Sequence, residues 1–374
     1  MQVERAELRG ALVSSQGVVT SGSYAAYRDD WLALHAEPAL EPDLAIIDAH
    51  HHIWDAPRPR YMFDELRRDL ESAGHKVLAT VYVDCRSMYR SDGPADMRCV
   101  GEVEFANGVA AMGASGAYGV TRVCAGIVGF GSLHLGGRAR PVLEALVQAG
   151  GSRFKGVRHI SAWDADPQVA PPHPDRPPGL LGSKAFREGF SLLGSLGLRF
   201  DAFLYQTQIP ELTALARAFP DTPIVLDHAG TPLGIGHYAG RRDELFGHWR
   251  NAIVELASCP NVSIKLGGLG MIVGGFGFNE RSRPPTSQEL AQAWGPYILT
   301  CIEAFGSQRC MFESNFPPDR ASCSYGVIWN AFKRIVAGAS ADEKADVFAR
   351  TSNSFYDLKM LAEASPSAAQ RPGT

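Results

Sequence analysis

The feature that most constrains the fold of this chain is an alternation of short apolar runs with longer segments of helical spacing. Eight runs have the length and residue types of buried strands, and they cover residues 44–52, 76–85, 121–130, 154–163, 198–205, 223–230, 261–268 and 309–316. Helix candidates between them include residues 140–150, 184–197, 209–219 and 243–258, with Gly or Pro near their ends. This alternation predicts an α/β fold, specifically a (β/α)8 barrel.

A doubly wound parallel sheet is the alternative architecture for such a chain. It is disfavoured because no glycine-rich dinucleotide fingerprint follows the first strand candidate. The length of 374 residues with 45% hydrophobic content is enough for one large barrel or for two ordinary domains. We therefore expect one barrel domain over residues 45–360.

Two terminal segments and one insertion lie outside the repeat. Residues 1–44 form an expected N-terminal extension with a helix candidate at 24–35, which would pack on the barrel or contact a second subunit. Residues 361–374 are small and polar, as in a flexible tail. The proline-rich insertion 164–179 follows the fourth strand, at the catalytic face of a barrel, so it serves either as a lid or pocket wall or as a passive spacer.

Charge and cysteine content narrow the class of partner. The formal net charge of -4 gives no general attraction to nucleic acid or to an anionic membrane, which favours a small-molecule substrate. The seven cysteines show no CxxC spacing, which argues against a disulfide scaffold and a cysteine zinc site. No run reaches the ~18 apolar residues of a spanning helix, and the first residues lack the pattern of a signal peptide. We expect a cytoplasmic protein.

Three consecutive histidines end the first strand candidate, in the sequence "IIDAHHHIWD". Because side chains alternate along a strand, His50 and His52 are expected to share one face with Asp48, whereas His51 points the other way. Two imidazoles at this spacing, at the carboxyl end of a barrel strand, can ligate one metal ion. The alternative is a set of histidines that hydrogen-bond to neighbouring loops.

Polar residues also end the sixth and eighth strand candidates. If Ile224 and Leu226 line the barrel interior, His228 shares their face and stands at the mouth, and Asp227 either faces the helices or supports its neighbours. Met311, Glu313 and Asn315 share one face of the eighth strand. A buried Glu313 is costly unless it is paired or functional, and Lys265 on the neighbouring strand is one partner that would neutralise it.

The pieces "DAHHHIWD", "PIVLDHAGTP" and "MFESNFPPD" resemble, in order and position, the amidohydrolase superfamily and within it the amidohydrolase-2 branch, over about residues 45–358. This branch contains lactonases and nonoxidative decarboxylases of aromatic acids. The resemblance implies a divalent metal, with zinc as the first choice, held by His50, His52 and His228. Some members of the branch resemble metal-free lactonases, so the resemblance leaves metal dependence open.

The chain departs from the family pattern at two strand ends. The fifth strand candidate has no histidine, only Asp201, Tyr205 and Gln206 near its end, and the family's eighth-strand Asp is here Asn315. An amide accepts hydrogen bonds but cannot take a proton, so the task of general base must move. Glu313 is the nearest replacement carboxylate.

Further polar residues at strand ends are candidates for the pocket. Alternation lets only one of Arg158 and His159 face inward. His159 would supply a metal ligand, polarise a substrate carbonyl or anchor the following loop. Arg86 suits bidentate capture of a substrate carboxylate, although it could equally hold its own loop. The remaining substrate-binding candidates are Tyr82, Asp84, Arg158 and Tyr205. The glycine-rich residues 265–278 have no GK[ST] and are expected to form an active-site loop.

The sequence therefore predicts a hydrolase that opens a lactone or a related carboxylate-bearing molecule. Its catalytic candidates are His50, His52, His159, His228, Glu313 and Asn315. The alternatives are an aromatic-acid decarboxylase and a catalytically inactive barrel that serves as a partner subunit. A homo-oligomer formed through the N-terminal extension is a further expectation.

Overall fold

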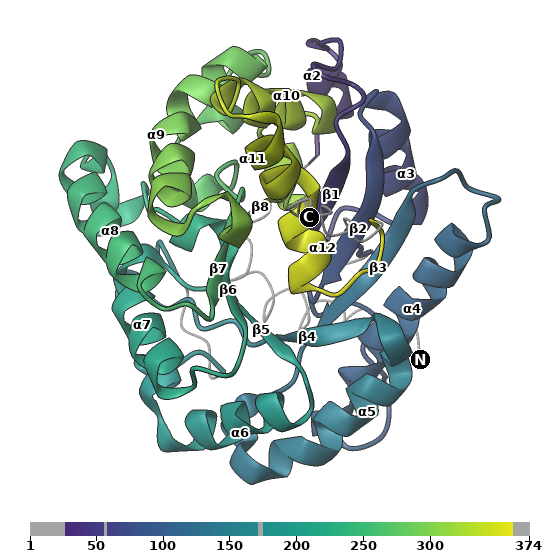
Figure 1. Ribbon diagram of the computed structural model, residues 1–374, viewed down its shortest axis with the longest axis vertical. Helices are drawn as coiled ribbons and strands as arrows, with labels where there is room; N and C mark the ends of the chain where they lie inside the picture. Colours follow the sequence, from purple (N-terminus) through teal and green to yellow (C-terminus); the bar gives the residue numbers. More distant parts are fainter. Residues whose placement is uncertain (1–26, 56–57, 171–174, 362–374) are drawn as a thin grey trace, which may run out of the picture.

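The computed structural model describes residues 27–55, 58–170 and 175–361. Eight parallel strands pair in the order β1-β2-β3-β4-β5-β6-β7-β8, with helices arranged around them (Figure 1). The strands are β1 (Ile46–His51), β2 (Val77–Val83), β3 (Arg122–Gly129), β4 (Phe154–Arg158), β5 (Arg199–Ala202), β6 (Ile224–Leu226), β7 (Val262–Leu266) and β8 (Cys310–Phe312). The predicted (β/α)8 barrel is confirmed, and every strand lies inside a predicted run.

One short helix precedes β1, and the other principal helices follow the strands in turn. They are α2 (Asp29–Leu32), α3 (Phe63–Ser72), α4 (Val100–Ala114), α5 (Arg140–Gly150), α6 (Lys184–Ser195), α7 (Ile209–Ala218), α8 (Arg242–Ala257), α9 (Ser287–Phe305), α10 (Tyr325–Ile335), α11 (Ala341–Ala345) and α12 (Thr351–Phe355). The four predicted helices correspond to α5, α6, α7 and α8. The helix expected at 24–35 is reduced to the four residues of α2, and residues 24–26 lie outside the described part, as do the predicted tail residues 362–374.

Main-chain hydrogen bonds close the barrel between β8 and β1. The N–H of His52 donates to the carbonyl of Phe316 at 2.7 Å, and the N–H of Asn315 donates to the carbonyl of His50 at 2.9 Å. Because these bonds lie at the carboxyl ends of the two strands, they bring the histidine stretch beside the segment that follows β8.

Two apolar clusters lie on the two sides of the strands. One fills the barrel interior and includes Ile47, Ala49 and Met311, and it extends to Tyr356 and Leu358 after α12, at the amino-terminal end of the barrel. The other lies between the strands and the helices and contains the buried faces of those helices. Both clusters exclude water, so a charged group at the carboxyl end of the interior must find partners there.

Two predicted side-chain directions are wrong. Ile224 and Leu226 belong to the cluster facing the helices, and Val225 fills the interior instead. Asp48 does not share the face of His50, because the register of β1 against β2 shifts between Asp48 and His51. Its carboxylate instead accepts hydrogen bonds from the Ser314 and Tyr325 side chains at 2.6 and 2.9 Å.

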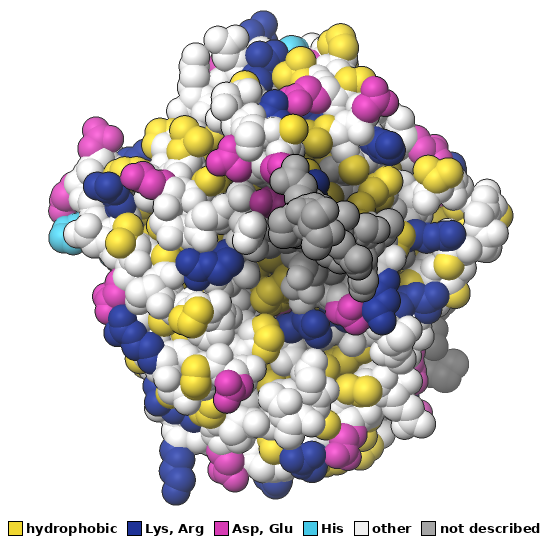
Figure 2. All heavy atoms as spheres, in the orientation of Figure 1, with side chains coloured by type: hydrophobic (Ala, Val, Ile, Leu, Met, Phe, Trp, Pro, Cys, Tyr) yellow, Lys and Arg dark blue, Asp and Glu magenta, His cyan; other side chains and the backbone are white. Residues whose placement is uncertain are grey.

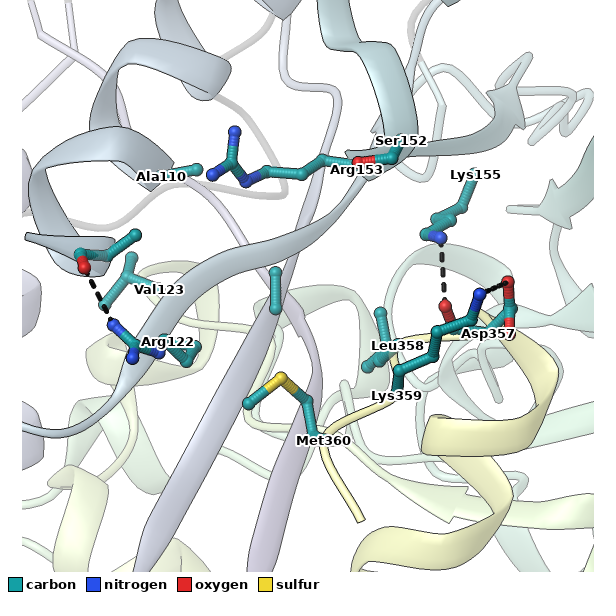
Figure 3. Close-up of a pocket in the computed structure, with 12 residues that line it drawn as sticks. Ala110, Arg122, Val123, Ser152, Arg153, Lys155, Asp357, Leu358, Lys359 and Met360 are labelled. Carbon is teal, nitrogen blue, oxygen red and sulfur yellow. Dashed lines mark hydrogen bonds and ion pairs between the residues drawn. The ribbon is translucent and has the colours of Figure 1, made fainter. Parts of the chain in front are cut away.

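A cavity of about 480 Å³ lies at the amino-terminal end of the barrel, away from the histidines. Arg122 begins β3 and Lys155 is the second residue of β4, and both line it with Asp357 (Figure 3). On the face in Figure 2, Lys and Arg side chains are interspersed with Asp and Glu. Among the described residues, no helix is long and apolar enough to cross a membrane. The seven cysteines are buried and none forms a disulfide.

Candidate active site at the carboxyl end of the barrel

The three consecutive histidines divide between two sides of β1. His50 Nε2 lies 3.2 Å from His52 Nε2, on the inner side of the barrel. His51 Nε2 lies 2.8 Å from the Thr80 hydroxyl, and its ring packs against Tyr82. The predicted division, with His50 and His52 together and His51 opposite, is confirmed as geometry.

His52 has a defined tautomer. Its Nδ1 lies 2.8 Å from the carbonyl oxygen of Val83, which only accepts, so Nδ1 carries the proton. Burial, reinforced by the charge of Arg158, lowers the pKa of His52 well below its usual value, so the ring is neutral. Its Nε2 therefore presents a lone pair toward His50, which suits a metal ligand or a hydrogen-bond acceptor.

A left-handed backbone conformation places the His228 ring in the site. The segment Asp227–Gly230 is a short 3-10 turn after β6, in which His228 has φ 58° and ψ 38°. The ring then meets Glu313 after β8: Nδ1 lies 2.7 Å from Glu313 Oε1, and the main-chain N–H donates to the same oxygen at 3.0 Å. Because an ionised carboxylate only accepts, Nδ1 carries the proton and Nε2 is left with its lone pair.

Two glycines after β7 permit this contact. A Cβ at position 267 would lie 2.4 Å from the Glu313 side chain, and one at position 268 would lie 2.4 Å from the His228 ring. Gly267 and Gly268 thus let the β7 backbone press against both partners. The predicted glycine-rich loop therefore belongs to the site.

Lys265 is the central cation of the site and is fully buried. Its Nζ donates to Asp201 at 2.6 Å, lies 3.0 Å from Asp227 and lies 3.1 Å from His50 Nδ1. The predicted partner Glu313 is not within ion-pair distance of Lys265, because Asp201 and Asp227 from β5 and the end of β6 are closer. Lys265 thereby joins the fifth, sixth and first strands.

Arg158 is the second buried cation. Its Nε donates to Asp84 Oδ1 at 2.6 Å, and it also donates to the main-chain carbonyl of Asp84. One terminal nitrogen lies 3.3 Å from His50 Nε2. The bidentate contact fixes the guanidinium against the histidine pair.

The inner cluster holds more negative than positive charge. Four buried carboxylates, Asp84, Asp201, Asp227 and Glu313, face two cations, Lys265 and Arg158, so neutral histidines leave an excess of two negative charges. Burial raises the pKa of Asp201 to about 6 although Lys265 opposes the shift, so this carboxyl is ionised at neutral pH. Burial also acts to raise the pKa of Glu313, but His228 and His50 lower it to about 2.

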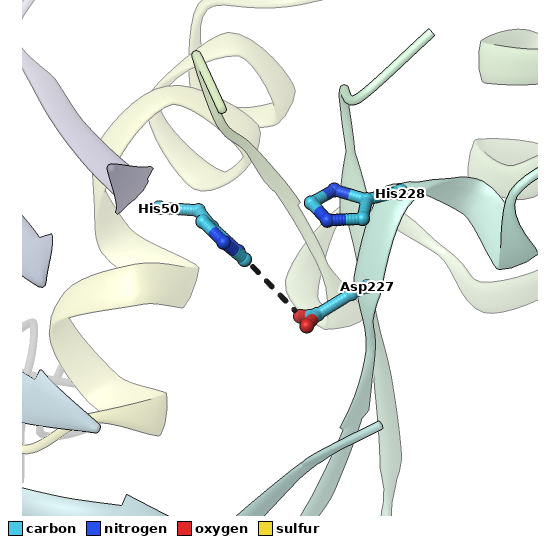
Figure 4. Close-up of side chains that lie close together, drawn as sticks. All are labelled: His50, Asp227 and His228. Carbon is cyan, nitrogen blue, oxygen red and sulfur yellow. Dashed lines mark ion pairs between the residues drawn. The ribbon is translucent and has the colours of Figure 1, made fainter. Parts of the chain in front are cut away.

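His50, Asp227 and His228 could hold a metal ion, because each offers a ligand atom and these atoms lie within 4.8 Å of one another. Figure 4 shows the His50 ring and the Asp227 carboxylate pointing toward each other, with the His228 ring beside them. Asp227 Oδ1 lies 3.0 Å from Lys265 Nζ, and Glu313 Oε2 lies 3.0 Å from His50 Nδ1. Asp227 Oδ2 has no hydrogen-bond partner among the described residues. This free carboxylate oxygen and the excess of two negative charges both fit a divalent cation.

Asn315 lies beside this cluster but makes its own buried contact. Its Nδ2 donates to Asp319 Oδ1 at 2.8 Å, and Asp319 Oδ2 accepts the N–H of Gly270 at 2.9 Å. Asp319 was not among the sequence candidates. The two prolines before it in "NFPPD" gave no indication that the chain forms a short turn there, which places the Asp319 carboxylate against the Asn315 amide.

The remaining candidates lie away from the histidine cluster. His159 Nδ1 accepts the N–H of Leu133 at 3.2 Å, so Arg158 faces inward and His159 holds a loop. Tyr82, predicted to contact substrate, donates instead to Glu102 at 2.9 Å on the helix side of β2. The Tyr205 hydroxyl lies 3.4 Å from the carbonyl of Val169.

Arg86 is paired with a residue of the proline-rich insertion. One of its terminal nitrogens donates to Asp175 Oδ2 at 3.2 Å. The described part of the insertion also packs Val169 and Ala170 against Tyr205 and Tyr238, which follow β5 and β6. These contacts favour the pocket wall over the passive spacer. His50, His52 and His228 are at most 4% exposed.

The expectation that Asp227 faces the helices and the expected partner of Lys265 are both wrong. Asp227 was predicted to turn toward the helices because Ile224 and Leu226 were placed in the interior. Val225 lies there instead, so regular alternation turns Asp227 inward, and the left-handed turn at His228 brings its ring to the same side. The signal for Lys265 was present, since a lysine in an apolar strand needs carboxylate partners. The sequence did not reveal which carboxylates these are.

Comparison with known proteins matches one family model and several similar proteins. The family model described as amidohydrolase matches residues 47–358. An uncharacterized protein, y4mH, of Sinorhizobium fredii is 30% identical over 84% of this chain and 99% of its own length. An L-fucono-1,5-lactonase of Burkholderia multivorans is 27% identical over 64% of this chain and 74% of its own. An amidohydrolase from Burkholderia multivorans, solved with bound zinc, shares the fold with a TM-score of 0.63 at 24% identity, over 84% of this chain and 99% of that one.

Proposed function

Because the chain belongs to the amidohydrolase family, we propose that it is a lactonase that opens the cyclic ester of a sugar acid by hydrolysis. The observation that carries this proposal is the pair of Glu313 and His228, which leaves one unprotonated ring nitrogen beside two further histidines at the carboxyl end of the barrel. The similarity to an L-fucono-1,5-lactonase supports a sugar-derived substrate.

In the proposed reaction, water attacks the carbonyl carbon of the lactone. A new C–O bond forms, the ring C–O bond breaks, and the ring oxygen leaves as a hydroxyl group of the product. His228 Nε2 accepts one proton of the attacking water and returns it to the leaving ring oxygen, and the other water proton is released with the carboxylate product. Glu313 keeps Nδ1 protonated and stabilises the imidazolium that forms, as the carboxylate does in carboxylate–histidine pairs.

Arg158 and Lys265 supply fixed positive charge next to the reacting groups. Arg158 is held by Asp84 and reaches His50, so it stands where negative charge on the carbonyl oxygen would be stabilised. Lys265 holds His50 from the other side through Nδ1. Asp84 holds the Arg158 side chain and Asp201 holds the Lys265 side chain before substrate binds, so neither cation has to reorganise during the reaction.

A divalent metal fits the site, with zinc as the proposed ion. His50, Asp227 and His228 would hold it, and His52 Nε2 offers a further ligand beside His50. Such an ion polarises a carbonyl oxygen and lowers the pKa of bound water. In either form of the enzyme, Glu313 holds the proton of the neutral His228 ring on Nδ1, so that Nε2 presents the lone pair that both ligation and proton acceptance require.

The test is a substrate panel with purified protein. Sugar 1,5-lactones, sugar 1,4-lactones and aromatic carboxylic acids are supplied in parallel, and released acid and CO2 are both measured, with zinc added and after chelation. We expect acid release from sugar lactones without CO2, and about one metal ion per chain by elemental analysis. CO2 from an aromatic acid would favour a decarboxylase instead. Inertness toward the whole panel, with zinc bound, would favour a noncatalytic partner subunit.

A further inference from the structure

Only one of the two polar side-chain atoms of Asn315 has a hydrogen-bond partner among the described residues. Its Nδ2 donates to Asp319 Oδ1 at 2.8 Å, whereas its Oδ1 is buried and has no hydrogen-bond partner among the described residues. The oxygen and nitrogen of an amide diverge from one carbon, so Oδ1 is turned away from Asp319. A buried acceptor without a partner is costly unless a ligand or water fills the place opposite it.

Asp319 is itself fixed by the glycine-rich loop. Its Oδ2 accepts the N–H of Gly270 at 2.9 Å, and a Cβ at position 270 would lie 2.9 Å from the same oxygen. Two residues earlier, Gly268 packs against the His228 ring. The same loop therefore contacts both His228 and Asp319, which places the Asn315–Asp319 pair next to the proposed proton acceptor.

Burial raises the pKa of Asp319 to about 7, so above neutral pH its carboxylate is ionised and offers only acceptors to its neighbours, whereas an amide offers both a donor and an acceptor. With one oxygen of Asp319 taken by Gly270, the other must receive a donor from Asn315. The amide then has one permitted orientation.

We propose that Asp319 is a positioning residue that turns the carbonyl oxygen of Asn315, and not its NH2 group, toward the reacting side of the site, where it accepts a hydrogen bond from the attacking water. The inference rests on the proposed lactonase function and explains how this site works without an eighth-strand Asp. Asn315 supplies the oxygen of that residue without its charge.

Asp319→Asn tests the orientation with almost no change of shape. The new amide must offer its oxygen to the Gly270 N–H, so its NH2 faces Asn315. Asn315 then rotates to accept with Oδ1, and it turns its own NH2 toward the water. The number of hydrogen bonds is unchanged, but a donor replaces an acceptor in the site.

The double variant Asn315→Asp with Asp319→Asn restores the oxygen. The carboxylate at position 315 accepts the NH2 at position 319 with one oxygen and presents the other to the site. By contrast, Asn315→Asp alone sets two buried carboxylates at the 2.8 Å separation now spanned by a hydrogen bond, which is unfavourable for both.

We expect Asp319→Asn to lower kcat/KM for the best sugar lactone by at least about tenfold, the equivalent of one hydrogen bond, with Tm close to that of the wild type. The double variant should recover most of that loss. The matched control is Asp346→Asn. Asp346 accepts a hydrogen bond of 2.8 Å from the hydroxyl of Ser307, a residue between α9 and β8, away from the histidines. Its kcat/KM should equal that of the wild type.

Activity that falls only in proportion to Tm, without recovery in the double variant, would overturn the positioning role. Unchanged activity in Asp319→Asn would overturn it as well.

A thermal-unfolding cycle tests the same pair without any substrate. Asn315→Asp alone should lower Tm, and the added Asp319→Asn should raise it again. Additive losses in Tm would overturn the donor and acceptor assignment. If the wild-type protein opens no lactone but the Tm cycle shows recovery, the proposed function fails while the orientation of the pair stands.

Discussion

Glu313 Oε1 accepts two hydrogen bonds from the same residue, one from the main-chain N–H of His228 at 3.0 Å and one from its ring Nδ1 at 2.7 Å. This double contact joins the ends of β6 and β8 and holds His228 in a left-handed backbone conformation with φ 58°. Such a conformation costs about 1 kcal/mol or more for a residue other than glycine. The carboxylate therefore fixes both the position and the tautomer of His228.

Replacing this carboxylate tests its role in proton transfer. Glu313→Gln keeps an oxygen to accept both bonds but removes the charge that stabilises a protonated His228. We expect kcat to fall by about 100-fold or more, in the range of general acid–base catalysis, while the circular dichroism spectrum is retained. Steady-state kinetics on a sugar lactone provides the measurement. A kcat equal to the wild-type value would remove Glu313 from the reaction.

Variants of the three consecutive histidines should differ in the property they lose: activity for a residue on the inner side of β1, and stability for His51 on the outer side. His50→Ala should abolish turnover because His50 joins Lys265, His52 and Arg158. His51→Ala removes a buried ring from the outer side of β1, so it should lower the free energy of unfolding by about 2 kcal/mol or more with kcat retained in the folded fraction. Denaturant unfolding and kinetics on both variants check this. Loss of kcat in fully folded His51→Ala would contradict the division.

Removal of the Lys265 cation should first of all lower the free energy of unfolding. Lys265→Met leaves Asp201 and Asp227 buried without their partner, which should cost about 3–5 kcal/mol. Adding Asp201→Asn removes one of the stranded charges and should recover part of this loss. Urea unfolding of both variants is the measurement. If the double variant were less stable than Lys265→Met, charge would not be the cause.

Glu102 should make stability depend on pH. Its Oε1 accepts bonds from the Tyr82 hydroxyl and from the N–H groups of Cys85 and Ser87. Burial, assisted by the charge of Asp84, raises its pKa from 4.5 to about 7. The folded state thus holds a proton that the unfolded state releases, so the stabilisation is complete below pH 4.5 and is lost as pH rises to 7.

Glu102→Gln removes this titration but keeps an oxygen for the three donors. The gain in stability of the variant over the wild type should therefore grow with pH across that window, by up to about 1.4 kcal/mol per pH unit. Tm measured for both proteins from pH 5 to 8 checks the trend. A difference that stays constant with pH would mean that Glu102 does not titrate there.

Much of the architecture was predictable because it depends on local patterns. Apolar runs alternating with helical segments favoured a barrel over a doubly wound sheet. All eight strands lie inside the predicted runs. The spacing of His50 and His52 was enough to predict that they share one side of β1, opposite His51. That this side is the inner one depends on the register shift between Asp48 and His51.

The rest depended on backbone irregularity and on long-range choice of partner. The register shift in β1 separated His50 from the face of Asp48, and the left-handed turn at His228 brought its ring to the side of Asp227. Neither is encoded in apolar periodicity, which assumes a regular pleat. The partners of Lys265 come from β5 and the end of β6, distant in sequence, so the sequence offered several carboxylates and no means to choose among them.

The most direct test of the proposed chemistry is the rate of acid release from a sugar 1,5-lactone, followed at constant pH, for zinc-supplemented wild type and His228→Ala at equal concentrations of folded protein. We predict that the wild type releases one equivalent of acid per lactone opened and no CO2, and that His228→Ala is slower by about 100-fold or more. A His228→Ala rate equal to that of the wild type would contradict the central role of the Glu313–His228 pair.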